Sequence, residues 1–127
     1  MPDRSYELGG VHVLECATEG PRLQHSCDAT AVIARALEQR IPWVVIPVAR
    51  LGDDFFRLRT GVAGDFIQKF VNYRIHLAIV GDISPYVEAS TALRDFVRET
   101  NRGGQVLFLA TVEELSARLR HLHSGSN

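Results

Sequence analysis

Three short runs of apolar residues, separated by segments with helical periodicity, constrain the fold more than any other feature of this sequence. The runs are Trp43–Ile46, Ile75–Val80 and Val106–Leu109. They lack the apolar-polar alternation of half-exposed strands, which indicates strands that are covered on both faces. Because helical segments separate the runs, we predict a mostly parallel sheet with right-handed crossovers.

Apolar side chains at helical spacing predict four helices, over about 26–40, 61–73, 90–101 and 111–122. Near the N-terminus, two strand-like segments flank Gly9-Gly10, and this pattern predicts a tight hairpin. The segment 81–85 is predicted to be a turn. The fold class is therefore α/β: a mostly parallel sheet with an N-terminal antiparallel hairpin and four helices. This element order resembles the STAS-like architecture of anti-sigma-factor antagonists.

The composition narrows the function classes. The 127 residues predict one domain, 1–127, with an ordered core over about 5–122. A net charge of −1 lacks the basic excess of nucleic-acid-binding proteins, so no nucleic acid is expected as a partner. No apolar run reaches the ~20 residues that span a bilayer, and the N-terminus lacks the apolar segment of a signal peptide. We therefore expect a cytoplasmic protein that does not bind membranes.

No cofactor and no metal is expected. The sequence contains no Walker loop, no dinucleotide-binding glycine motif and no nucleophile elbow. Its only cysteines, Cys16 and Cys27, with His25 between them, match no usual zinc spacing. Two cysteines also form no disulfide framework, which agrees with a cytoplasmic setting.

The middle of the chain carries longer motifs. Gln-Lys-Phe-Val-Asn-Tyr-Arg occupies residues 68–74, and Ala-Ile-Val-Gly-Asp occupies residues 78–82. With their surroundings, over Asp54 to Leu109, these motifs resemble the bacterial family known as domain of unknown function 4180. The resemblance is looser over the N-terminal third. It implies a small single-domain cytoplasmic bacterial protein of unassigned activity, and it implies no catalytic residues.

A ligand site is expected beyond the carboxyl ends of the parallel strands, where open α/β sheets bind ligands. The loops at that edge are Val48–Phe56, Gly81–Ser90 and Ala110–Glu113. The candidate ligand-binding residues in and beside them are Arg50, Asp53, Asp54, Arg57, Asp82, Ser84 and Tyr86. The candidate catalytic residues are Asp54, Asp82 and Tyr73.

Each carboxylate candidate also has a structural interpretation. Asp53 and Asp54 are adjacent at an expected helix start, so a role in capping is favoured over a role in chemistry. For Asp82, a turn role and a ligand role are about equally supported. Tyr73 lies at a helix end and is favoured as structural.

The basic residues Arg57, Arg59, Lys69 and Arg74 crowd the second helix and its entry. They could bind an anion or the carboxylates of a partner. A solvated surface, with neighbouring aspartates as ion-pair partners, is favoured.

The leading hypothesis is a binding or regulatory module that recognises a small polar ligand or a protein partner at the carboxyl ends of the strands. The alternative is a small cofactor-independent enzyme that acts on a polar metabolite with aspartates as acid or base. A third hypothesis is a mainly structural protein that forms a homodimer through the edge hairpin or through an exposed helix, because an unpaired edge strand invites pairing.

Overall fold

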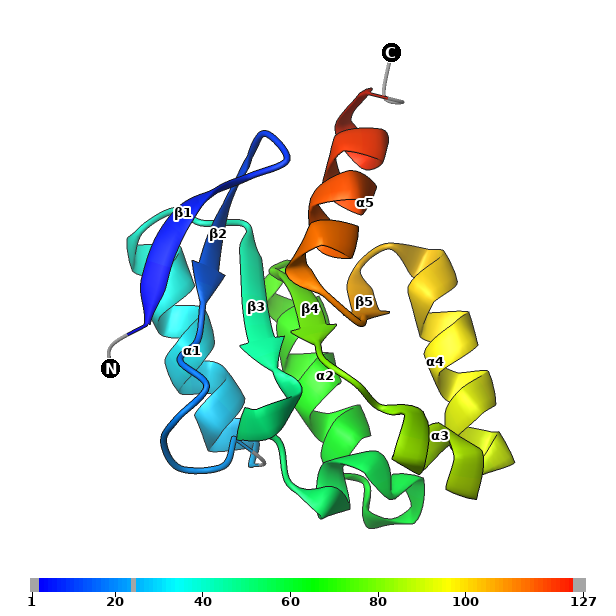
Figure 1. Cartoon of the computed structure of the whole chain (residues 1–127). Coiled ribbons are helices and arrows are strands. Elements are labelled where there is room, and N and C mark those ends of the chain that lie inside the picture. Colours follow the sequence, from blue (N-terminus) through cyan, green and yellow to red (C-terminus); the bar gives the residue numbers. More distant parts are fainter. Residues whose placement is uncertain (1–2, 24, 125–127) are drawn as a thin grey trace.

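A five-stranded sheet forms the centre of the computed structural model, which describes residues 3–23 and 25–124 (Figure 1). The strands lie side by side in the order in which they occur along the chain. They are β1 (Arg4–Leu8), β2 (Val11–Glu15), β3 (Trp43–Pro47), β4 (His76–Val80) and β5 (Val106–Leu109). β1 pairs antiparallel with β2, and all the other pairs are parallel. The predicted mostly parallel sheet with an N-terminal antiparallel hairpin is confirmed.

The described residues form five α-helices, one more than predicted. They are α1 (Ser26–Glu38), α2 (Val62–Tyr73), α3 (Ser84–Ala89), α4 (Thr91–Gly103) and α5 (Val112–Ser124). The additional helix is α3, which begins inside the segment 81–85 that was predicted as a turn. Pro85 in its first turn and Asp82, whose side chain accepts the N–H of Ser84, favour a helix start there. The STAS-like resemblance of the element order stays a prediction.

The sheet is covered on both faces, as the apolar runs predicted. On one face, Val44 and Ile46 of β3 and Leu77 of β4 pack in a core that α1, α2 and α4 share. On the other face, Val45 and its neighbours on the adjacent strands pack against Leu115 and Leu119 of α5. Because successive side chains of a strand point to opposite faces, each apolar run supplies both cores.

The hairpin turn depends on a close contact with α5. Gly9 has φ +60°, and a Cβ at this position would lie 2.8 Å from the carbonyl oxygen of Ser116 and 2.9 Å from Cβ of Leu119. Only glycine allows the turn to approach the helix this closely. The hairpin and the last helix are therefore held together, although they come from opposite ends of the chain (Figure 1).

None of the helices within residues 3–23 and 25–124 is long and apolar enough to cross a membrane.

Candidate functional site

The first residues after β3 and after β4 pack against each other at the carboxyl edge of the sheet. Gly81, directly after β4, has φ +143°, and a Cβ there would lie 2.8 Å from Cβ of Val48, the first residue after β3. A side chain at position 81 would push the two strand ends apart. This contact brings together the two loops that carry most of the predicted site residues.

A surface pocket with a volume of about 630 Å³ lies beside these strand ends. One wall comes from two short 3₁₀ helices, η2 (Asp53–Phe56) and η3 (Leu58–Thr60), and the other from α3 and the start of α4. The volume is within the usual range for sites that bind small molecules. The lining residues are Asp53, Phe56, Arg57, Leu58, Arg59, Pro85, Tyr86, Ala89, Ser90 and Ala92.

An aromatic pair joins the two walls of the pocket. The rings of Phe56 and Tyr86 stack with a centroid distance of 4.3 Å and an interplanar angle of 14°. The hydroxyl of Tyr86 donates a hydrogen bond to Oδ1 of Asp53 over 2.9 Å. The pKa of Tyr86 is raised above its usual value, mainly by this hydrogen bond to a carboxylate and secondly by partial burial. The two contacts fix the width of the pocket before any ligand binds.

The buried end of this aromatic pair is anchored in the core. Phe56 is 3% exposed and contacts Phe55 edge-on at 5.1 Å. Phe55 in turn contacts Phe66 of α2 at 5.7 Å. The 3₁₀ segment is therefore tied to α2 by aromatic packing, and its polar side chains project from a fixed base.

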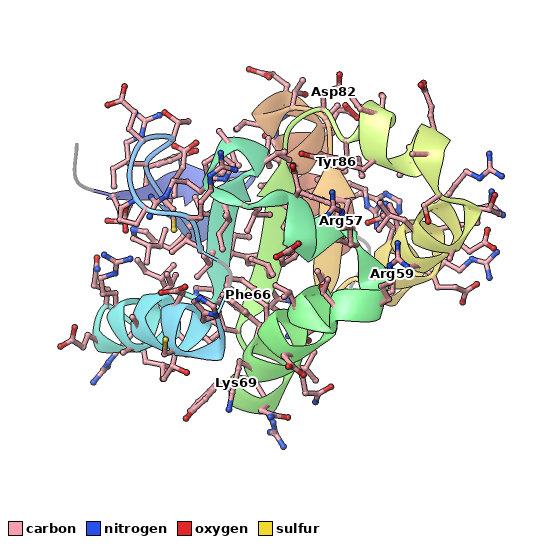
Figure 2. All side chains as sticks on the ribbon, turned by 90° about the horizontal axis from the view of Figure 1, so that it is seen from below. Arg57, Arg59, Phe66, Lys69, Asp82 and Tyr86 are labelled. Carbon is pink, nitrogen blue, oxygen red and sulfur yellow. The ribbon has the colours of Figure 1, made fainter. Side chains whose placement is uncertain are left out.

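One wall of the pocket carries two arginines and the carboxylate of Asp53, so its lining residues have a net positive charge. Arg57 and Arg59 both line the pocket, and Arg57 approaches Oδ1 of Asp54 at 3.7 Å. At this distance, and with both side chains more than half exposed, the ion pair is weak and leaves Arg57 able to bind another anion. Figure 2 shows Arg57, Arg59 and Tyr86 on the same part of the carboxyl edge, with Lys69 on the far side of Phe66.

Thr60 holds the segment that carries both arginines. Its hydroxyl lies 2.7 Å from the carbonyl oxygen of Asp54 and 2.8 Å from that of Arg57, and it accepts the N–H of Val62 at 3.2 Å. One side chain thus closes the loop between η2 and α2. These contacts between residues close in the sequence hold the backbone of Arg57 and Arg59 in place and leave their guanidinium groups unburied.

The start of α4 adds to the positive potential. Ser90 caps this 13-residue helix, and its Oγ accepts the N–H of Leu93 at 3.1 Å. Ser90 and Ala92 both line the pocket, so the N-terminus of the helix opens toward it. The partial positive charge of a helix N-terminus favours an anion there and adds to the charge of the two arginines.

Three of the predicted ligand-binding residues, Asp53, Arg57 and Tyr86, line this pocket, and Asp54 adjoins it through Arg57. Asp53 and Asp54 lie at a helix start as expected, but the prediction that one of them caps the helix is wrong. Both lie in η2, where Gly52 is the N-cap and makes no side-chain cap bond. The third expected loop, 110–113, contributes none of the described lining residues.

Arg50 has another position. Its Nε donates to the carbonyl oxygen of Pro21 and its Nη1 to that of Ala17, both over 2.9 Å. Its guanidinium carbon also lies 3.2 Å from where a Cβ of Gly20 would be. Arg50 therefore fixes the loop between β2 and α1, and it is not among the residues that line the pocket.

Asp82 and Ser84 are not among the residues that line the pocket, and Figure 2 shows Asp82 toward the outer edge. Oδ1 of Asp82 accepts the backbone N–H of Ser84 over 2.9 Å, which forms the turn that begins α3. Hydrogen bonds from the side chain and the backbone of Ser84 lower the pKa of the exposed Asp82 carboxyl. These contacts agree with the turn interpretation of Asp82.

Tyr73 lies at the opposite end of the molecule. It is the last residue of α2, two residues separate it from β4, and it is 48% exposed. The twelve residues of α2 span about 18 Å, which separates Tyr73 from the carboxyl edge where the helix starts. Tyr73 therefore cannot act together with Asp54 or Asp82.

Arg59 and Ser90 line the pocket but are not among the ligand-binding residues predicted from the sequence. Arg59 was among the crowded basic residues of the sequence, and its alternation with Arg57 was the signal that could have selected it. The sequence predicts Ser90 at a helix start, which is confirmed, but it does not reveal α3, the helix that brings Ser90 to the pocket. Within residues 3–23 and 25–124, no three histidine, cysteine, aspartate or glutamate side chains are placed to hold a metal ion.

No curated protein and no solved structure matches this chain. A family model described as Domain of unknown function (DUF4180) matches residues 8–119. The match extends the resemblance expected over Asp54 to Leu109 across almost the whole chain, and the protein therefore belongs to the DUF4180 family.

Proposed function

We propose that this protein is a small binding or regulatory module that recognises an anionic small molecule in the pocket between η2–η3 and α3–α4. The observation that carries the proposal is the convergence of Arg57, Arg59 and the N-terminus of α4 on one cavity of about 630 Å³. Guanidinium groups and backbone N–H groups are donors that carboxylates and phosphates bind well.

The apolar part of the ligand is expected to contact the aromatic and aliphatic lining. Leu58, Pro85 and Ala89 offer apolar surface next to the stacked Phe56–Tyr86 pair. A ligand that combines an acidic group with a flat apolar body would use both halves of the pocket. We place this activity in the cytoplasm of a bacterium, a setting that the two unpaired cysteines support.

Binding is favoured over acid-base catalysis by the state of the carboxylates. Asp53 already accepts a hydrogen bond from Tyr86, and Asp54 lies beside Arg57. Asp82 has a lowered pKa, whereas a general acid near neutral pH needs a raised one. A ligand-binding role requires no change in any of these pairs.

The proposal is tested with probes that share a benzene ring and differ in charge. Phenyl phosphate and benzoate are expected to raise the melting temperature and to bind in calorimetry, whereas benzylamine and benzyl alcohol are not. Replacing Arg57 or Arg59 by Gln should weaken phenyl phosphate binding more than about tenfold, because a charged hydrogen bond contributes roughly 1.5–3 kcal/mol.

Arg120→Gln is the matched control, since it removes the same charge from α5, on the other face of the sheet. Its affinity for phenyl phosphate should equal that of the unchanged protein. Equal responses to the anionic and cationic probes, or equal losses in Arg57→Gln and Arg120→Gln, would refute an anion site here. Turnover of a phosphate or carboxylic ester that is lost in Asp54→Asn would favour the enzyme hypothesis instead.

A further inference from the structure

The two edges of the sheet differ in how they end. At β5, the side-chain amide of Asn101 in α4 bonds to both backbone groups of Phe108: Oδ1 accepts its N–H over 2.7 Å, and Nδ2 donates to its carbonyl oxygen over 3.3 Å. Asn101 thus takes the place that a neighbouring strand would occupy. This edge is closed by the molecule itself, which is one way in which proteins prevent edge-to-edge association.

The other edge, β1, is left open. The two-residue turn pairs Leu8 with Val11 and Tyr6 with Val13, and the antiparallel alternation leaves the backbone groups of Ser5 and Glu7 facing outward. In the described part of the chain, no segment outside the hairpin bonds to those groups. β1 has no proline and no bulge within its five residues, so it keeps the form that another strand can pair with.

β1 is also held in place before any partner arrives. At its start, Asp3 accepts the N–H of Ala17 over 2.9 Å and forms an ion pair with Arg35 of α1 at 2.7 Å. At its end, the Gly9 turn is packed against α5. An edge fixed at both ends loses little conformational entropy when it pairs.

We propose that two copies of this chain associate through β1, antiparallel across a two-fold axis, and extend the sheet from five strands to ten. Antiparallel pairing of a strand with its own copy satisfies the symmetry of a closed dimer. In this orientation neither Arg4 nor Glu7 has to lie opposite its own copy. A parallel arrangement would bring like charges together.

One register overlaps all five residues of the strand. It places Tyr6 opposite the partner's Tyr6 on the axis, Ser5 opposite the partner's Glu7, and Arg4 opposite the partner's Leu8. Tyr6 is only partly buried in the monomer, so an aromatic cross-strand pair with the partner's Tyr6 would bury more of its ring. Shifting the register toward the turn would set Glu7 opposite the partner's Glu7, which is unfavourable.

The interface is small. Two five-residue strands bury less surface than the 1,200–2,000 Å² of a standard stable complex, so we expect a dissociation constant on the order of 10–100 µM. Sedimentation velocity over a concentration series measures it directly. The unchanged protein should pass from monomer to dimer within that range.

Substitutions at Ser5 test both the surface and the register, because this side chain is exposed in the monomer. Ser5→Lys should tighten the dimer and Ser5→Glu should weaken it, each by about fivefold to tenfold, since two pairs with the partner's Glu7 change at once. Ser5→Glu combined with Glu7→Lys should restore the affinity. Ser5→Pro should abolish the dimer by removing an outward N–H, whereas Ser5→Ala should leave it intact.

Circular dichroism and urea unfolding confirm that each variant remains folded. The proposal is overturned if the unchanged protein stays monomeric into the millimolar range. It is also overturned if a dimer forms whose dissociation constant is the same in Ser5→Lys, Ser5→Glu and Ser5→Pro, because that dimer would use another surface. Neither result bears on the anion pocket, which is measured with phenyl phosphate.

Discussion

Replacing Asn101 by Ala should destabilise the protein far more than a helix-end asparagine normally does. The side chain makes two hydrogen bonds to Phe108, a residue that is 6% exposed. Each bond contributes about 1 kcal/mol, and a backbone group that stays buried without a partner adds to the cost. The gain in helix propensity from Asn to Ala offsets only a few tenths of a kcal/mol. We therefore expect a loss of roughly 2 kcal/mol in the free energy of unfolding.

Asn72→Ala is the control for this prediction. Asn72 also lies near the end of a helix, but its exposed side chain only accepts a hydrogen bond from Gln68 on the same helix, over 2.9 Å. Such surface pairs contribute about 0.2–0.5 kcal/mol, which the gain in propensity cancels. Urea unfolding measures both variants, and the Phe108 amide should exchange faster in Asn101→Ala. If the two variants differ by less than about 0.5 kcal/mol, Asn101 does not close this edge.

The packing supports four further predictions. Gly81→Ala should cost about 1–3 kcal/mol in urea unfolding, because its Cβ would lie 2.8 Å from Val48 at a positive φ. Gly64→Ala, at an exposed α2 position where a Cβ meets nothing within 4 Å, should instead stabilise the protein by up to about 1 kcal/mol. Burial raises the pKa of Cys16 to about 12, so a thiol reagent at neutral pH should label Cys27 and reach Cys16 only after unfolding. Above pH ~9 the unfolded Cys16 thiol ionises and the folded one does not, so stability should fall toward pH ~12 with a slope of up to about 1.4 kcal/mol per pH unit.

The sheet could be predicted because burial leaves a local pattern in the sequence. A strand covered on both faces is apolar at every position, and three such runs with helical segments between them leave few topologies. The hairpin could be predicted equally well, from two glycines between strand-like segments. By contrast, α3 has six residues, too few to show helical periodicity, and its start at Pro85 resembles that of a turn.

The candidate site was predicted in part for the same reason. Rules on parallel sheets locate the carboxyl edge, and they selected Asp53, Arg57 and Tyr86 correctly as neighbours. They could not show that Arg50 lies outside the pocket, because it bonds to a loop more than twenty-five residues away in the sequence. They also could not reveal Asn101, because its role depends on a strand edge that exists only once the sheet has formed.

The anion pocket and the open edge lie on different parts of the sheet, and this separation has a measurable consequence. β1 and β4 are three positions apart in the strand order, and the pocket lies beyond β4, between η2–η3 and α3–α4. None of the described pocket-lining residues belongs to the hairpin. A dimer formed through β1 would therefore leave both pockets open and equivalent. The affinity for phenyl phosphate should be the same in Ser5→Pro and in the unchanged protein, at concentrations below and above dimerisation. A difference between them would mean that strand pairing alters the pocket through the shared sheet, and that the two surfaces are energetically coupled.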